Sequence, residues 1–153
     1  MIKYIYTFFL GLLLATFVGV GISTFYPSPK EPTLPDSYTR SDVKELTTEE
    51  KQAEETYRTE QKTFQTTFSV YNRNVSLIAL VFSLVTLVIA LGFAQKLPVV
   101  ADGLLLGGVF TLLYSIGRGL ASADPQFRFV VTTIGLIIAL VLGYLKFIRA
   151  QTE

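Results

Sequence analysis

The sequence predicts an all-α integral membrane protein with four transmembrane helices and a long extramembrane helix continuous with the second span. Half of the 153 residues are hydrophobic and only 16% are charged, whereas about a quarter of the residues in a soluble domain are charged. The charges are also concentrated, because seven of the 13 Lys and Arg and nine of the 12 Asp and Glu lie between Lys30 and Arg73. Four apolar stretches outside this segment approach the length of about 20 residues that a helix needs to cross the hydrocarbon layer.

The first apolar stretch, Tyr4 to Tyr26, reads YIYTFFLGLLLATFVGVGISTFY and follows Lys3. A cation before an apolar run is typical of a signal peptide, and Gly19-Val20-Gly21 is compatible with cleavage between small residues. The run is longer than the apolar core of most signal peptides. We therefore expect residues 1–26 to be retained as a signal-anchor-like transmembrane helix that ends at the sequence YPSP.

A polar segment follows the first span and divides into a linker and a helix. Residues 27–40 contain four of the six prolines and predict an extended linker. Residues 41–73 contain no Gly or Pro, and Ser41 or Thr47 is suited to cap a helix there. Thr47 with Glu50 matches a capping box. Apolar residues recur at helical spacing into the second span without a breaker, which predicts one helix from the 40s to about Ala94 with a length of roughly 75–80 Å.

The polar helix carries an aromatic stripe formed by Tyr57, Phe64, Phe68 and Tyr71. A helix that projects from the bilayer cannot bury such a stripe in lipid, so we expect it to contact a second copy or a partner protein. The alternative is a solvated helix near the membrane surface. A robust two-stranded coiled coil is not expected, because Glu50 and Glu60 occupy seam positions.

The remaining spans lie within residues 74–149 and precede a short tail, 150–153. The predicted spans are Val75 to Ala94, Val99 to Leu120 and Phe127 to Phe147. Pro98 is suited to the first turn of the third span, and Asp124 with Pro125 is suited to begin the fourth. The connections are short, so we expect antiparallel neighbours.

Small residues recur in three of the spans, mostly every fourth residue, and predict where helices approach closely. They are Gly11, Ala15, Gly19 and Ser23 in the first span, Gly103 and Gly107 in the third, and Gly135, Ala139 and Gly143 in the fourth. We call each of these rows of small residues a ridge, and two interpretations of the ridges remain open. They either pack the four helices of one chain together or form a self-association face between subunits.

Polar residues within the spans are the other candidate sites. Ser76, Ser83 and Thr86 share one face of the second span, which either lines a polar pore or forms a tight helix contact. Asp102 and Arg118 lie near opposite ends of the third span, about 24 Å apart along a helix and too far apart to pair. Each complements the helix dipole at its own end, which favours a structural role.

Several functions have no support in the sequence. The chain lacks Cys and His, and we find no paired carboxylates, phosphate loop or metal-ligand cluster, so we expect no catalytic residues, no cofactor and no metal. No basic cluster is interleaved with exposed aromatics, so we expect no nucleic-acid partner.

The partners that the sequence does predict are the lipid bilayer, further copies of the chain and a protein bound by the 41–73 helix. We expect a homo-oligomeric membrane assembly, with a channel or pore as one form of it. The alternatives are a scaffold or accessory subunit that docks a partner through the 41–73 helix and, with less support, a small transporter subunit. The Lys and Arg counts on the two sides are close under the positive-inside rule. Because the first span resembles a signal anchor, we expect both termini in the cytoplasm, and we expect the protein in the plasma membrane.

Overall fold

A computed structural model of the chain describes residues 1–36 and 47–148. The helices are α1 (Ile2–Phe25), α2 (Thr48–Phe93), α3 (Pro98–Leu120) and α4 (Pro125–Gly143), and a π-helical segment, η2 (Tyr144–Ile148), follows α4. All four α-helices are long and apolar enough to cross a membrane. The prediction of an all-α protein with four such helices is confirmed. The predicted cap at Ser41, the end of the linker and the tail 150–153 lie outside the described residues.

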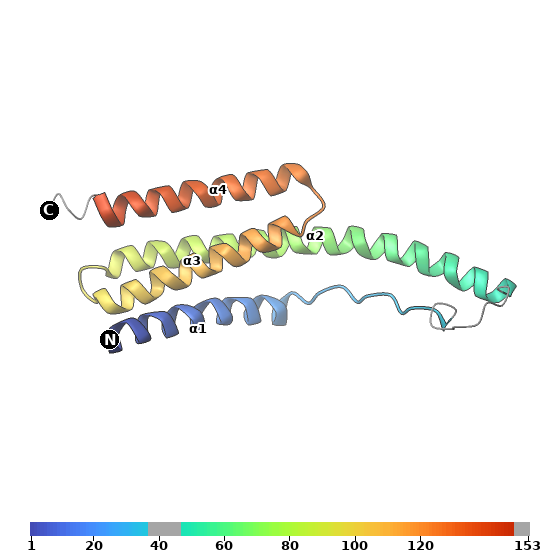
Figure 1. Ribbon diagram of the computed structural model, residues 1–153, viewed down its shortest axis with the longest axis horizontal. Coiled ribbons are helices and arrows are strands. Elements are labelled where there is room, and N and C mark those ends of the chain that lie inside the picture. The colour runs from blue at the N-terminus through green and yellow to red at the C-terminus, as the bar shows by residue number, and fades with distance from the viewer. Residues whose placement is uncertain (37–46, 149–153) are drawn as a thin grey trace.

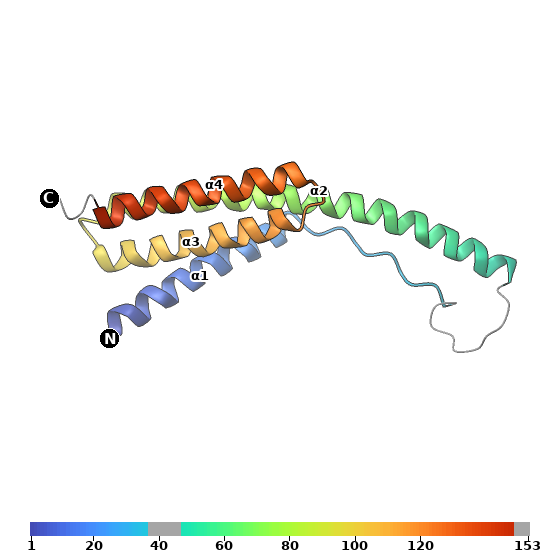
Figure 2. The ribbon, with the colours of Figure 1, turned by 45° about the horizontal axis from the view of Figure 1, so that its top comes forward.

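Helix α3 is the centre of the arrangement, because α2 and α1 both pack closely along it and α4 packs on it less extensively. Helices α2, α3 and α4 run antiparallel to one another in chain order (Figure 1). Helices α1 and α4 lie on opposite sides of α3 in both views (Figures 1 and 2). The beginning of α1 and the end of α4 lie at the same end of the bundle, as an even number of antiparallel helices requires.

The helix ends follow local capping rules, and this part of the sequence prediction is confirmed. The Thr47 hydroxyl accepts from the Glu50 backbone N–H at 3.3 Å, and the Glu50 carboxylate accepts from the Thr47 N–H at 2.8 Å. One carboxylate oxygen of Asp124 accepts from the backbone N–H groups of Gln126 and Phe127. Pro98 and Pro125 occupy the first turns of α3 and α4, where no helical donor is lost.

Helix α2 has 46 residues and is much longer than the others. Its polar N-terminal part continues beyond the ends of α1 and α3, where the described part of the linker runs beside it (Figures 1 and 2). We call residues 48–68 the arm. The arm presents mostly exposed side chains, whereas the rest of α2 contributes Val75, Ala79, Leu80 and Leu87 to the buried core.

The end of α4 differs from the predicted span. The α-helix ends at Gly143 and the chain continues as the π-helix of η2, although the prediction extended the span to Phe147. Because a π-helix has more residues per turn than an α-helix, the position of Lys146 around the helix differs from the one that a continued α-helix would give it. Lys146 belongs to this segment.

Candidate functional site

The hydroxyl groups of the proposed pore face lie in the contact between α2 and α3. The Ser76 hydroxyl donates to the Ser115 carbonyl at 2.8 Å, and the Ser115 hydroxyl donates to the Ser76 carbonyl at 2.7 Å. Ser83 donates to the Gly108 carbonyl at 2.8 Å. All three serines are fully buried, and Thr86 is half-buried. Within one chain, therefore, the serines of this face join two helices and do not line a polar path.

Four of the predicted small residues lie at close helix contacts inside the chain. A Cβ added to Gly11 would lie 3.1 Å from the Gly107 backbone nitrogen, and one added to Gly107 would lie 3.2 Å from the Gly11 carbonyl oxygen. At the other two glycines, a side chain from a neighbouring helix occupies the space that a Cβ would need. It is Leu10 at Gly103 and Ile116 at Gly135.

The remaining small residues of α1 are only partly covered by the rest of the chain. Ala15 is half-buried, Ser23 is exposed, and Gly19 has no atom within 4 Å of an added Cβ. The physical reason is the helical period, because residues spaced by four drift about 40° per step around a helix of 3.6 residues per turn. The buried positions of α1 are instead Gly11, Val18 and Ile22.

The second half of α4 is similarly uncovered. The buried residues of α4 are Val131 and Gly135, and no residue of the helix beyond Gly135 is buried. Ala139 is exposed, and a Cβ on Gly143 would have no atom within 4 Å. Helix α4 therefore packs closely on α3 from their connecting turn as far as Gly135.

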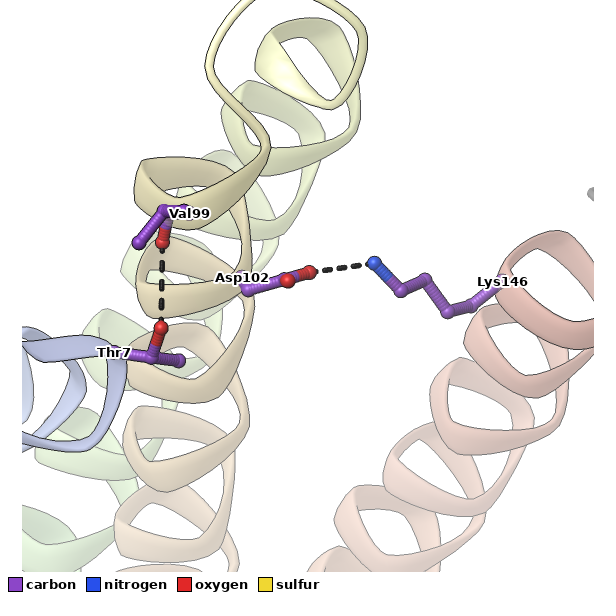
Figure 3. A network of polar contacts seen from close by, with 4 residues as sticks. All are labelled: Thr7, Val99, Asp102 and Lys146. Carbon is purple, nitrogen blue, oxygen red and sulfur yellow. Dashed lines mark hydrogen bonds and ion pairs between the residues drawn. The ribbon is translucent and has the colours of Figure 1, made fainter. Parts of the chain in front are cut away.

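An ion pair links the far end of α4 to α3. Lys146 Nζ lies 2.6 Å from Asp102 Oδ1, and both side chains are nearly half exposed. Figure 3 shows the lysine reaching across from its own helix, while Thr7 of α1 donates to the Val99 carbonyl on the other side of α3. The sequence analysis identified Asp102 but not its partner, which lies 44 residues away.

Arg118 lies at the opposite end of α3, in a cluster of aromatic and amide side chains. Its guanidinium carbon lies 5.7 Å from the centroid of the Tyr71 ring and 5.5 Å from that of Tyr114. Its Nη1 donates to Asn72 Oδ1 at 2.9 Å, and its Nε donates to the Tyr114 hydroxyl at 3.2 Å. Sequence analysis missed Asn72, because an Asn beside the polar segment carries no signal of burial.

The aromatic stripe of α2 forms a column of rings that continues into this cluster. Phe64 stacks on Phe68 at 5.4 Å between centroids, Phe68 packs beside Tyr71 at 6.1 Å, and Tyr71 stacks on Tyr26 at 5.3 Å. Phe64 also lines one groove with Pro29 and Pro32 of the linker, and Tyr57 is half-buried. Part of the predicted assembly stripe is thus covered by the same chain.

The described residues contain no group of three or more His, Cys, Asp or Glu side chains able to hold a metal ion. Comparison of the chain with protein-family models, curated proteins and solved structures finds no match.

Proposed function

We propose that the protein is a non-enzymatic membrane protein that forms a homo-oligomeric assembly through the uncovered half of α4. The observation that carries the proposal is the open small-residue surface at Ala139 and Gly143. In lipid, close packing of small residues replaces hydrophobic burial as the force between helices. A small-residue surface without a partner in its own chain is available for a helix of another chain.

The chain itself shows how such a surface is filled. Added Cβ atoms at Gly103, Gly107 and Gly108 would each meet a leucine side chain from another helix. Each of these glycines therefore packs against a large aliphatic side chain. Helix α1 lies on the flank opposite α4, and it exposes Phe8, Phe9, Leu12 and Leu13. We infer that α4 of one copy packs on α1 of the next, a head-to-tail contact that generates a ring when the rotation closes.

The proposal also includes the position of the arm and of both termini relative to the bilayer. The arm extends the second span into water on one side of the bilayer, because its charged residues are costly to place in hydrocarbon. Both termini lie on the cytoplasmic side of the plasma membrane. A pore in this assembly lies between copies, since Ser76, Ser83 and Ser115 are already bonded inside each chain.

A pair of glycine substitutions tests the α4 surface. Gly143→Leu fills the open ridge, and Gly92→Leu places the same side chain near the end of α2, where an added Cβ also meets nothing within 4 Å. Both variants gain the same helix propensity. We expect the wild type and the Gly92→Leu variant to be oligomeric, and the Gly143→Leu variant to be monomeric with unchanged helix content. The measurements are native mass spectrometry and circular dichroism of the purified protein.

A Gly143→Leu variant that stays oligomeric contradicts the α4 contact, and a monomeric wild type contradicts the assembly as a whole. Ion flux in liposomes containing the wild type, lost in Gly143→Leu, identifies the assembly as a pore.

The second candidate function is a scaffold that docks a partner protein on the arm. It is favoured by the arm itself, which the other three α-helices leave uncovered (Figure 1). A wild type that is monomeric in native mass spectrometry and binds a partner only when the arm is present supports this alternative.

A further inference from the structure

We propose that the cluster of Arg118, Asn72, Tyr71 and Tyr114 binds the phosphate of an anionic phospholipid headgroup. The first argument is the excess of hydrogen-bond donors. Arg118 donates to Asn72 and Tyr114, which leaves part of its guanidinium fork unused. Asn72 is fully buried, its Oδ1 is occupied by Arg118, and its Nδ2 has no partner. The buried Asn72 oxygen holds one edge of the guanidinium, and the unused donors of Arg118, which is only half-buried, fit an acceptor group that comes from outside the chain.

The second argument is charge. Within residues 1–36 and 47–148, no carboxylate forms an ion pair with Arg118. Asp124 is near in sequence, but its carboxylate caps α4. A second guanidinium lies at the same turn, because Arg128 Nε donates to the Ser122 carbonyl. Among the described residues Arg118 therefore has no carboxylate partner, although Asp124 at the same turn keeps its negative charge.

The third argument is location. Arg118 lies in the last turn of α3, and Tyr26, just past the end of α1, stacks on Tyr71 of the cluster. Tyrosines in membrane proteins gather at the level of the lipid headgroups. A phospholipid phosphate is therefore the anion that is present at this depth at high local concentration.

The fourth argument is preorganisation. The two tyrosine rings and the two hydrogen bonds hold the guanidinium in one orientation. A fixed guanidinium binds phosphate oxygens in pairs and loses little side-chain entropy when it does so. A structural role in offsetting the α3 dipole explains the position of Arg118. It does not provide an acceptor for the unused donors of the guanidinium.

The test measures lipid preference in native mass spectrometry of the full-length protein. The protein is mixed with equal amounts of phosphatidylglycerol and phosphatidylcholine of the same acyl chains. Both lipids offer a phosphate, but the choline cation of phosphatidylcholine cancels its charge and is repelled by Arg118, so we expect the wild type to retain phosphatidylglycerol about tenfold better. Arg118→Gln should abolish the preference and Arg118→Lys should lower it. Arg73→Gln, which removes an exposed cation beside Asn72, should leave it unchanged.

Asn72→Asp provides a variant that is expected to fold even if Arg118→Gln does not. The new carboxylate would pair with Arg118, neutralise the cluster and accept in place of the amide oxygen, so the phosphatidylglycerol preference should disappear while thermal stability is kept. Equal retention of both lipids by the wild type overturns the proposal, as does a preference that survives in Asn72→Asp or Arg118→Gln. Equal thermal protection by millimolar inorganic phosphate and by phosphatidylglycerol would assign the cluster to a soluble phosphate and would also overturn it.

Discussion

At the scale of single residues, Ser76 and Ser115 join two helices of this chain by hydrogen bonds. In lipid, hydrophobic burial does little to determine which faces of two helices pack together. Each hydroxyl donates to the backbone carbonyl of the other residue. Since lipid tails are as apolar as leucine, such bonds and close packing decide which helix faces meet. Both serines are fully buried, so neither can exchange its bond for water without opening the α2–α3 contact.

Removing one of these hydroxyls should have a modest and specific cost. We expect Ser115→Ala to lower the free energy of unfolding by about 0.5–1.5 kcal/mol, the usual net contribution of one hydrogen bond. The measurement is unfolding in mixed micelles with increasing denaturing detergent. Ser23→Ala is the control, because Ser23 is exposed and bonds to the carbonyl of Val20 in its own helix. Equal effects of the two substitutions would show that the reciprocal pair adds nothing.

A second residue-scale prediction concerns the crossing of α1 and α3. Gly107→Val should destabilise the protein by about 1–3 kcal/mol, the usual cost of overpacking, because a Cβ there meets Leu14 and the Gly11 carbonyl oxygen. Gly117→Val is the matched control on the same helix, since its Cβ meets nothing within 4 Å. Thermal unfolding in detergent compares the two. A Gly107→Val protein as stable as the control would disprove this crossing.

The sequence predicted residue contacts only where both partners belong to one turn of the chain. Thr47 with Glu50 and Asp124 with Pro125 are local patterns, and the structure confirms them. The partner of Asp102 was missed, because Lys146 reaches it from another helix. Contacts between helices depend on how each helix is rotated about its own axis, and a single sequence does not determine that rotation.

At the scale of elements, the arm is stabilised by different contacts from the rest of α2. Thr56, Thr59 and Thr63 are exposed, and each donates to the carbonyl four residues earlier in the same helix. Such bonds satisfy the hydroxyl but do not join the arm to anything else. Phe64 lines a groove together with Pro29 and Pro32 of the linker, which lies beside the arm, and Phe68 packs against Tyr71.

The arm should therefore depend on the linker for its helical structure. We expect a peptide of residues 41–73 to be mostly unfolded in aqueous buffer, because threonine is a poor helix former and the peptide lacks tertiary contacts. A peptide of residues 27–73 should be more helical by circular dichroism, and Phe64→Ala should remove the difference. Strong helicity in the shorter peptide would contradict this account.

Elements were more predictable than contacts, for a physical reason. The thickness of the bilayer sets a minimum length for each apolar span, and capping residues and prolines limit its ends. The structure accordingly begins α3 and α4 at Pro98 and Pro125. The end of α4 was predicted less well, because hydropathy does not distinguish the π-helix of Tyr144–Ile148 from a continued α-helix.

At the scale of the whole molecule, charge is distributed between the two ends of the bundle. The end that holds the chain's N-terminus and the α2–α3 turn carries Lys3, Lys96 and Lys146. Among the described residues, the opposite end carries more cations, but they are spread over a longer, acidic stretch: Lys30, Lys51, Arg58, Lys62, Arg73, Arg118 and Arg128. Acidic residues count little in setting orientation, so charge alone does not decide which end is cytoplasmic. The signal-anchor character of the first span favours placing the N-terminal end in the cytoplasm.

This orientation is testable with single cysteines, since the chain contains none of its own. Ser28→Cys lies in the linker at the arm end, and Gln95→Cys lies in the turn between α2 and α3 at the other end; both positions are exposed. We expect a membrane-impermeant thiol reagent to label residue 28 on intact cells and to label residue 95 only after the membrane is opened. The reverse result would place the termini outside. Labelling of both positions on intact cells would mean that α2 does not cross the bilayer, because α2 is the helix that separates them, and the four-span arrangement would then be wrong.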